Sequence, residues 1–170
     1  MSSQVLSSQA TAGRVEAIDV WARLLRGHSA LRRSLDAKLQ AEHGLTVRDY
    51  ECLLLLSRAE DNLMRRVDLA EGLQLTASGV TRLLGGLEKA GLVDKETCSS
   101  DARVSYAVLT GAGKRKLSES SQSHIVAVTE LFEELFSEEE IAILATLLGR
   151  IPGASNGSGG EGEACSPPSE

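Results

Sequence analysis

The sequence contains few of the residues on which several protein classes depend. Its three cysteines are widely spaced, which argues against a disulfide framework and makes the cytoplasm the expected compartment. Aromatic residues form only 3% of the chain, leaving little with which to build a cofactor site. There is no run of about 18 apolar residues to cross a membrane. Because neither a metal-ligand cluster nor a nucleophile–base pair is recognisable, we expect no metal, no cofactor and no enzymatic activity.

Positive charge is also scarce, since the formal net charge is -6 at pH 7. Its distribution is uneven, however. Between residues 76 and 116, seven basic residues stand against four acidic ones. Attraction to a polyanion depends on the charges near its phosphates rather than on the overall sum. A locally basic segment in an acidic protein is therefore compatible with nucleic-acid binding.

The 170 residues, 42% of them hydrophobic, are enough for one well-cored domain, which we expect to span residues 14–151. Residues 1–13 are rich in Ser, Gln, Ala and Thr and lack the basic start and apolar core of a signal peptide. Residues 152–170 are rich in Gly, Ser, Glu and Pro. Both ends are expected to be disordered.

Apolar residues at three- and four-residue spacing predict long helices from about residue 15 to 43 and from residue 110 onward, the second followed by a last helix that begins at Ser137. Two shorter helices are expected after the capping box Thr46–Asp49 and over residues 65–73. The long helices carry apolar stripes wider than a small domain can cover. A second copy of the chain is the simplest partner for them.

The segment from Thr76 to Gly91 is the most informative stretch. Thr76 is a candidate N-cap, and Gly91 stands where a helix end favours positive φ. The buried stripe is expected to comprise Val80, Leu84 and Leu87. The outer face of the first two turns has only short polar or cationic side chains: Ala77, Ser78, Thr81 and Arg82. Together with the preceding short helix, this pattern is typical of a helix-turn-helix whose second helix enters a DNA groove.

After Gly91 the apolar period changes from 3.6 to 2, which predicts strands over residues 92–97 and 104–109. The polar residues 98–103 between them form the expected hairpin tip. A hairpin directly after a recognition helix is a wing. The predicted fold class is therefore mainly α with a small β hairpin: a winged helix-turn-helix (residues 45–109) flanked by long helices (residues 14–44 and 110–151).

This order of elements resembles the MarR family of bacterial winged-helix transcriptional regulators. The motifs that carry the resemblance are Asp68-Leu69-Ala70-Glu71, Leu75-Thr76-x-Ser78-x-Val80-Thr81-Arg82-x-Leu84, Leu87-Glu88-Lys89-x-Gly91-Leu92-Val93, and Asp101-x-Arg103 followed by Leu109-Thr110-x-x-Gly113. The resemblance implies a homodimer joined by the long helices. It also implies sequence-specific binding to double-stranded DNA at a pseudo-palindromic operator, with recognition helices about 34 Å apart. A repressor released by a small, possibly phenolic, effector is the implied mode of action.

The candidate DNA-binding residues lie on the recognition helix and the wing: Thr76, Ala77, Ser78, Thr81, Arg82, Lys95, Asp101 and Arg103. Arg82 is expected to contact a guanine edge or a phosphate, with a surface ion pair as the alternative. Arg103 is expected to reach a minor groove, with Asp101 orienting it. The family usually has a basic residue at position 102, where this chain has Ala102. We therefore expect the wing to contact DNA with one positive charge fewer than is usual in the family.

Four further points are left open by the sequence. Trp21, His28 and Tyr50 are candidates for an effector crevice, although core or interface packing explains them as well. Cys98, at the expected wing tip, is a candidate for a redox switch. The winged helix is alternatively a protein–protein interaction module. The pair Gly85-Gly86 costs a helix roughly 1 kcal/mol per glycine relative to Ala and has no explanation from sequence beyond close packing.

Overall fold

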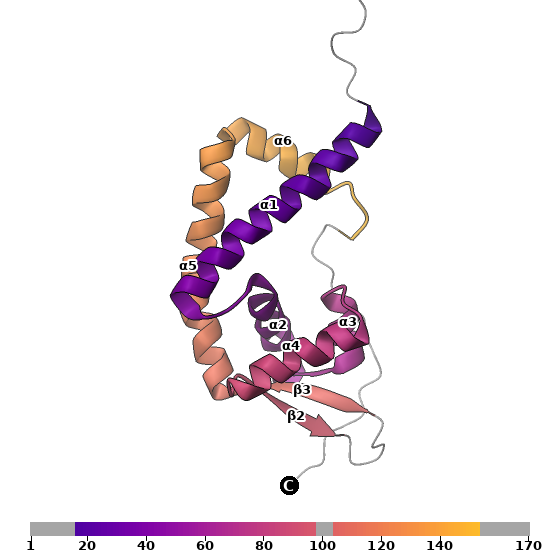
Figure 1. The fold of residues 1–170 in the computed structure, drawn as a ribbon, viewed down its shortest axis with the longest axis vertical. Helices are drawn as coiled ribbons and strands as arrows, with labels where there is room; N and C mark the ends of the chain where they lie inside the picture. Colours follow the sequence, from indigo (N-terminus) through magenta and orange to yellow (C-terminus); the bar gives the residue numbers. More distant parts are fainter. Residues whose placement is uncertain (1–15, 98–103, 154–170) are drawn as a thin grey trace, which may run out of the picture. The chain divides into compact units, whose positions relative to one another are not determined.

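The computed structural model describes residues 16–97 and 104–153. The chain divides into two compact units, residues 1–34 and 35–170, and each is described by itself. The described part of the first unit is the N-terminal portion of helix α1 (Ala17–His43). The second unit contains the end of α1 and every other element in Figure 1.

After the end of α1, the second unit continues with three helices and three short strands that form the winged lobe. After α2 (Val47–Arg58) and a 3₁₀ turn, η1 (Glu60–Asn62), come β1 (Leu63–Arg65), α3 (Arg66–Gly72), α4 (Ala77–Lys89), β2 (Val93–Thr97) and β3 (Ser105–Leu109). Helix α5 (Gly111–Leu135) then leads away from the sheet to α6 (Glu138–Leu148), as Figure 1 shows. The predicted fold class, mainly helical with a small antiparallel sheet, is confirmed.

Helix boundaries follow the predicted caps. Thr46 accepts from the backbone N–H of Asp49 at 3.1 Å, while the Asp49 carboxylate accepts from the Thr46 N–H at 2.8 Å. Ser137 begins α6 with the same reciprocal arrangement. Each cap satisfies backbone donors that the first helical turn leaves without a partner. Gly91 has a φ of +69°, which confirms its expected role as the residue that ends α4.

The core of the winged lobe is built from the apolar faces of its helices and from the two longer strands. Leu39 near the end of α1 is 2% exposed. Other side chains that are essentially inaccessible include Leu53, Leu56, Leu69, Val80, Leu84 and Val93. The predicted apolar stripe of α4 is therefore buried in the core, as its helical spacing indicated. The opposite face of α4 lies at the surface.

The sheet has one strand more than the sequence predicted. Its order is β1-β3-β2, with Leu63 opposite Val108 and Val93 opposite Leu109 in antiparallel register. Strand β1 was missed because three residues carry no usable periodicity, and only pairing with β3 holds them extended. The preceding residues, Asp61 and Asn62, have positive φ values of 51° and 59°, and the expected start of α3 shifts by one residue because Arg65 belongs to β1.

Candidate nucleic-acid interface

The outer face of α4 is the surface that the sequence singled out. Thr76, Ala77, Ser78, Thr81 and Arg82 are all exposed, whereas the stripe on the opposite face is buried. None of the exposed side chains is acidic. The structure therefore brings five of the eight candidate DNA contacts together on two consecutive helical turns.

The hydroxyl groups on this face are pre-oriented by the helix itself. Thr81 Oγ1 donates to the Ala77 carbonyl oxygen at 2.8 Å, and Thr76 Oγ1 accepts from the Gly79 N–H at 3.2 Å and lies 3.1 Å from Ser78 Oγ. Arg82 makes no hydrogen bond or ion pair with any residue that the structure describes. Its guanidinium is thus available to an external anion, and the alternative of a surface ion pair has no support among these residues.

The turn between α3 and α4 is fixed by an arginine that sequence reasoning missed. Arg48 Nη1 of α2 donates to the Leu73 carbonyl oxygen at 2.7 Å and pairs with Glu51 Oε2 at 3.1 Å. Gln74 follows with a φ of 52°, and the Leu75 N–H donates to the Ala70 carbonyl oxygen at 2.8 Å. Arg48 therefore links α2 to the end of α3, directly before the turn that leads into α4.

The wing contributes one described candidate. Lys95 is exposed on β2, between the exposed Asp94 and Glu96. Asp101, Arg103 and Cys98 lie outside the described residues, so their predicted roles at the wing tip stay predictions.

Known proteins with a similar sequence or fold are transcriptional regulators. A model of the MarR family matches residues 43–104. The structure superimposes on AbsC, a MarR family transcriptional regulator from Streptomyces coelicolor, with a TM-score of 0.68 and 31% identity over 80% of this chain and 93% of AbsC. Sco3205, a MarR family regulator from the same organism solved in complex with DNA, gives a TM-score of 0.70 and 27% identity over 81% of this chain and 87% of Sco3205.

The chain belongs to the MarR family. It is a DNA-binding transcriptional regulator and not an enzyme. The transcriptional repressor YetL of Bacillus subtilis is 29% identical over 65% of this chain and 66% of its own length. Within the described residues of this MarR family member, no helix is both long and apolar enough to span a bilayer, and no three potential ligands among His, Cys, Asp and Glu gather into a metal site.

The candidate effector residues occupy different environments in this MarR family protein. Trp21 and His28 are exposed on α1. Tyr50 of α2 is 8% exposed; its hydroxyl donates to Ser121 Oγ at 3.3 Å and its ring centroid lies 4.6 Å from that of His124. Tyr50 thus packs α2 against α5, and a crevice lined by the three predicted residues stays a prediction.

Cys52 is the cysteine that the structure describes, and it is fully buried on α2. Burial, with a smaller contribution from the negative charge of Asp49, raises the pKa of its thiol to about 12. Because the thiolate is the reactive form, Cys52 is chemically protected in the folded protein. It serves as a small residue of the hydrophobic core.

Proposed function

We propose that the protein is a homodimeric, sequence-specific transcriptional repressor that a small ligand releases from its operator in the bacterial cytoplasm. The observation that carries the proposal is the outer face of the first two turns of α4, which is exposed and free of carboxylates. It also presents Arg82, which has no ion-pair partner among residues 16–97 and 104–153. Such a face suits a major groove, where short hydroxyl side chains meet phosphates or bases and an arginine recognises guanine bidentately.

Exposed apolar side chains support the dimer. Large apolar residues on α5 and α6 are at least 38% exposed in the single chain: Ile125, Val126, Leu135, Ile143, Leu147 and Leu148. Soluble monomers rarely leave so many apolar side chains uncovered, and a second copy buries them with closed symmetry. Two copies would present two α4 helices to half-sites about one DNA turn apart, so we expect a pseudo-palindromic operator.

A relative's function and a thermodynamic argument support repression and ligand release. YetL, to which the chain is similar, is named a transcriptional repressor, and a repressor needs a signal that ends repression. A small ligand whose binding differs between DNA-bound and free conformations supplies such a signal, because it shifts the equilibrium by its differential affinity.

A gel-shift titration with duplex DNA from upstream of the protein's own gene tests the proposal. We expect saturable binding that exceeds binding to a scrambled duplex and weakens as salt rises, since phosphate contacts release counterions. Light scattering after size exclusion should report two chains per particle. A folded dimer that binds no duplex at low salt would instead indicate a protein–protein interaction module, and the proposal would be wrong.

A further inference from the structure

We propose that the methyl group of Thr81, beside that of Ala77, contacts the C5 methyl group of thymine in the major groove and so selects this base. The inference names a base that the outer face of α4 recognises, and it therefore rests on the proposed function. It also gives Thr81 a role different from a phosphate contact, because the hydrogen atom of its hydroxyl group is already engaged within the helix.

The hydroxyl group of Thr81 has no hydrogen left for a phosphate. Thr81 Oγ1 donates to the Ala77 carbonyl oxygen at 2.8 Å, and a hydroxyl group carries a single hydrogen. Because the phosphate oxygens of DNA only accept hydrogen bonds, Thr81 in this conformation does not donate to one of them. The parts of its side chain that remain available to DNA are the lone pairs of Oγ1, which accept, and the γ-methyl group.

The two hydroxyl groups at the start of α4 still have a hydrogen for a phosphate. Thr76 Oγ1 lies 3.1 Å from Ser78 Oγ, and one of the two groups donates to the other. The second hydroxyl hydrogen has no acceptor among the residues that the structure describes. Both side chains are exposed at the N-terminal end of the helix, where the helix dipole favours an anion. Phosphate and base contacts are therefore divided between different side chains of α4.

Ala77 adds a second methyl group next to that of Thr81. It is the first residue of α4 and precedes Thr81 by four positions, so the two side chains are neighbours on one face of the helix, with about 5–6 Å between their Cβ atoms. Both residues are exposed. The side chain of Ala77 offers DNA a methyl group and no hydrogen-bonding atom. The outer face of α4 thus includes a small apolar surface formed by Ala77 and Thr81.

Thymine is the base whose chemistry matches this apolar surface. Among the four bases, thymine is the one that presents a methyl group in the major groove, and alanine side chains and threonine methyl groups are suited to contact it. The alternative partner of Thr81 is an amino group of adenine or cytosine, which would donate to the lone pairs of Oγ1. The methyl contact is favoured because Ala77, the neighbour of Thr81 on this face, adds apolar surface and no second side-chain acceptor.

Replacement of thymidine by deoxyuridine tests the contact from the DNA side. Deoxyuridine pairs with adenine through the same atoms and lacks only the C5 methyl group. The full-length protein is titrated in gel shifts with the duplex from upstream of its own gene, prepared once with thymidine and once with deoxyuridine throughout. We expect the thymidine duplex to bind more tightly, by about fourfold for each half-site, which is the effect of burying one methyl-sized group.

Threonine variants test the contact from the protein side, through the ratio of the dissociation constants for the two duplexes. Thr81→Ser keeps the hydroxyl group and removes the methyl group, so the preference for thymidine should disappear. Thr81→Val keeps a methyl group and removes the hydroxyl group, so the preference should remain. Thr146→Ser is the matched control and should show the wild-type ratio, because Thr146 is exposed on α6 and donates to the Ala142 carbonyl oxygen at 3.0 Å in the same way. Comparing ratios removes the general effect of deoxyuridine on DNA shape, which acts on every variant alike.

The outcomes distinguish this inference from the proposed function. A protein that binds neither duplex would refute the proposed function and the inference with it. Equal binding of both duplexes by the wild type would overturn the inference alone, and so would a preference for thymidine that survives in Thr81→Ser. Loss of the preference in Thr81→Val would also overturn it, because the hydroxyl group would then be the contact. Circular dichroism checks that each variant keeps the fold.

Discussion

The Thr110 hydroxyl donates a hydrogen bond of 2.8 Å to the carbonyl oxygen of Gly91, across nineteen residues of sequence. The same hydroxyl accepts from the Gly113 N–H at 3.0 Å, and the Thr110 N–H donates to the Leu92 carbonyl oxygen at 3.2 Å. One threonine thus begins α5 and fastens it to the turn that ends α4. In a dimer held by α5, this contact would transmit the position of one helix to the other.

Gly113 makes this contact possible, and Gly113→Ala is expected to destabilise the fold. A Cβ atom there would overlap the Leu92 carbonyl oxygen and lie 2.6 Å from Leu109 Cδ1. Overpacking against backbone typically costs about 1–3 kcal/mol. Urea denaturation should show a lower free energy of unfolding of that size. Gly111→Ala is the control, since its nearest neighbour is the mobile end of Arg115 at 3.7 Å; equal effects of the two substitutions would contradict the steric account.

Arg82→Ala is expected to weaken binding to specific duplex DNA by about 1–3 kcal/mol if the guanidinium reads a base edge. Arg82→Lys keeps the charge but loses the bidentate geometry. Comparing the two variants in gel shifts with specific and scrambled duplexes separates base recognition from phosphate attraction. A lysine variant that binds the specific duplex as well as the wild type would assign Arg82 to a phosphate.

Local features of the fold were predictable, because a cap or a helical stripe depends on residues a few positions apart. The capping boxes at Thr46 and Ser137, the end of α4 at Gly91 and the buried face of α4 are of this kind. Strand β1 was not predictable, since Leu63–Arg65 becomes a strand only through pairing with β3. The role of Arg48 was missed for a similar reason, because Leu73 is 25 residues away.

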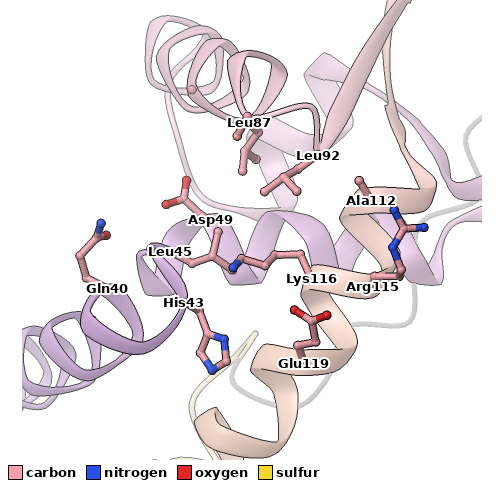
Figure 2. Close-up of a pocket in the computed structure, with 13 residues that line it drawn as sticks. Gln40, His43, Leu45, Asp49, Leu87, Leu92, Ala112, Arg115, Lys116 and Glu119 are labelled. Atoms are coloured by element: carbon pink, nitrogen blue, oxygen red, sulfur yellow. The ribbon is translucent and has the colours of Figure 1, made fainter.

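A pocket beside the C-terminal end of α4 (Figure 2) shows the same limit. Its charged and apolar lining comes from residues between Gln40 and Glu119, and no local pattern indicates that they meet. The sequence did show that Gly85-Gly86 is unfavourable in a helix. This unfavourable pair indicates that a requirement other than helix stability applies there. Only the tertiary arrangement shows that Gly86 lines this pocket and that Gly85 does not.

Gly85→Met tests whether Gly85 lies on the face of α4 that contacts DNA. Gly85 follows Thr81 by four residues and Arg82 by three, so helical geometry places it on the outer face of α4. We expect a methionine there to hold α4 away from the groove and weaken operator binding, although it should raise the free energy of unfolding by about 0.5–1 kcal/mol. Gel shifts and urea denaturation measure the two effects. Undiminished DNA affinity would show that Gly85 does not face the duplex.

His124 predicts a pH dependence of stability. Its ring packs on Tyr50 between α2 and α5, and its Nδ1 atom is buried without a hydrogen-bond partner in the described part of the chain. Burial lowers the pKa of His124 below its ordinary value of 6.5, and the charge of Glu51 opposes this only partly. The folded state therefore favours the neutral ring, so the stabilising contribution is complete above pH 6.5 and is lost as the pH falls through 6.5 toward the folded-state pKa.

The measurement is the free energy of unfolding of the wild type and of His124→Gln at pH 7.5 and pH 5.5. The variant loses the ring contact at both pH values, so only the difference in slope reports protonation. We expect the wild type to lose more stability than the variant on acidification, because a protonated ring would carry a buried N–H at Nδ1 without an acceptor. Parallel losses in the two proteins would show that another group accounts for the acid sensitivity.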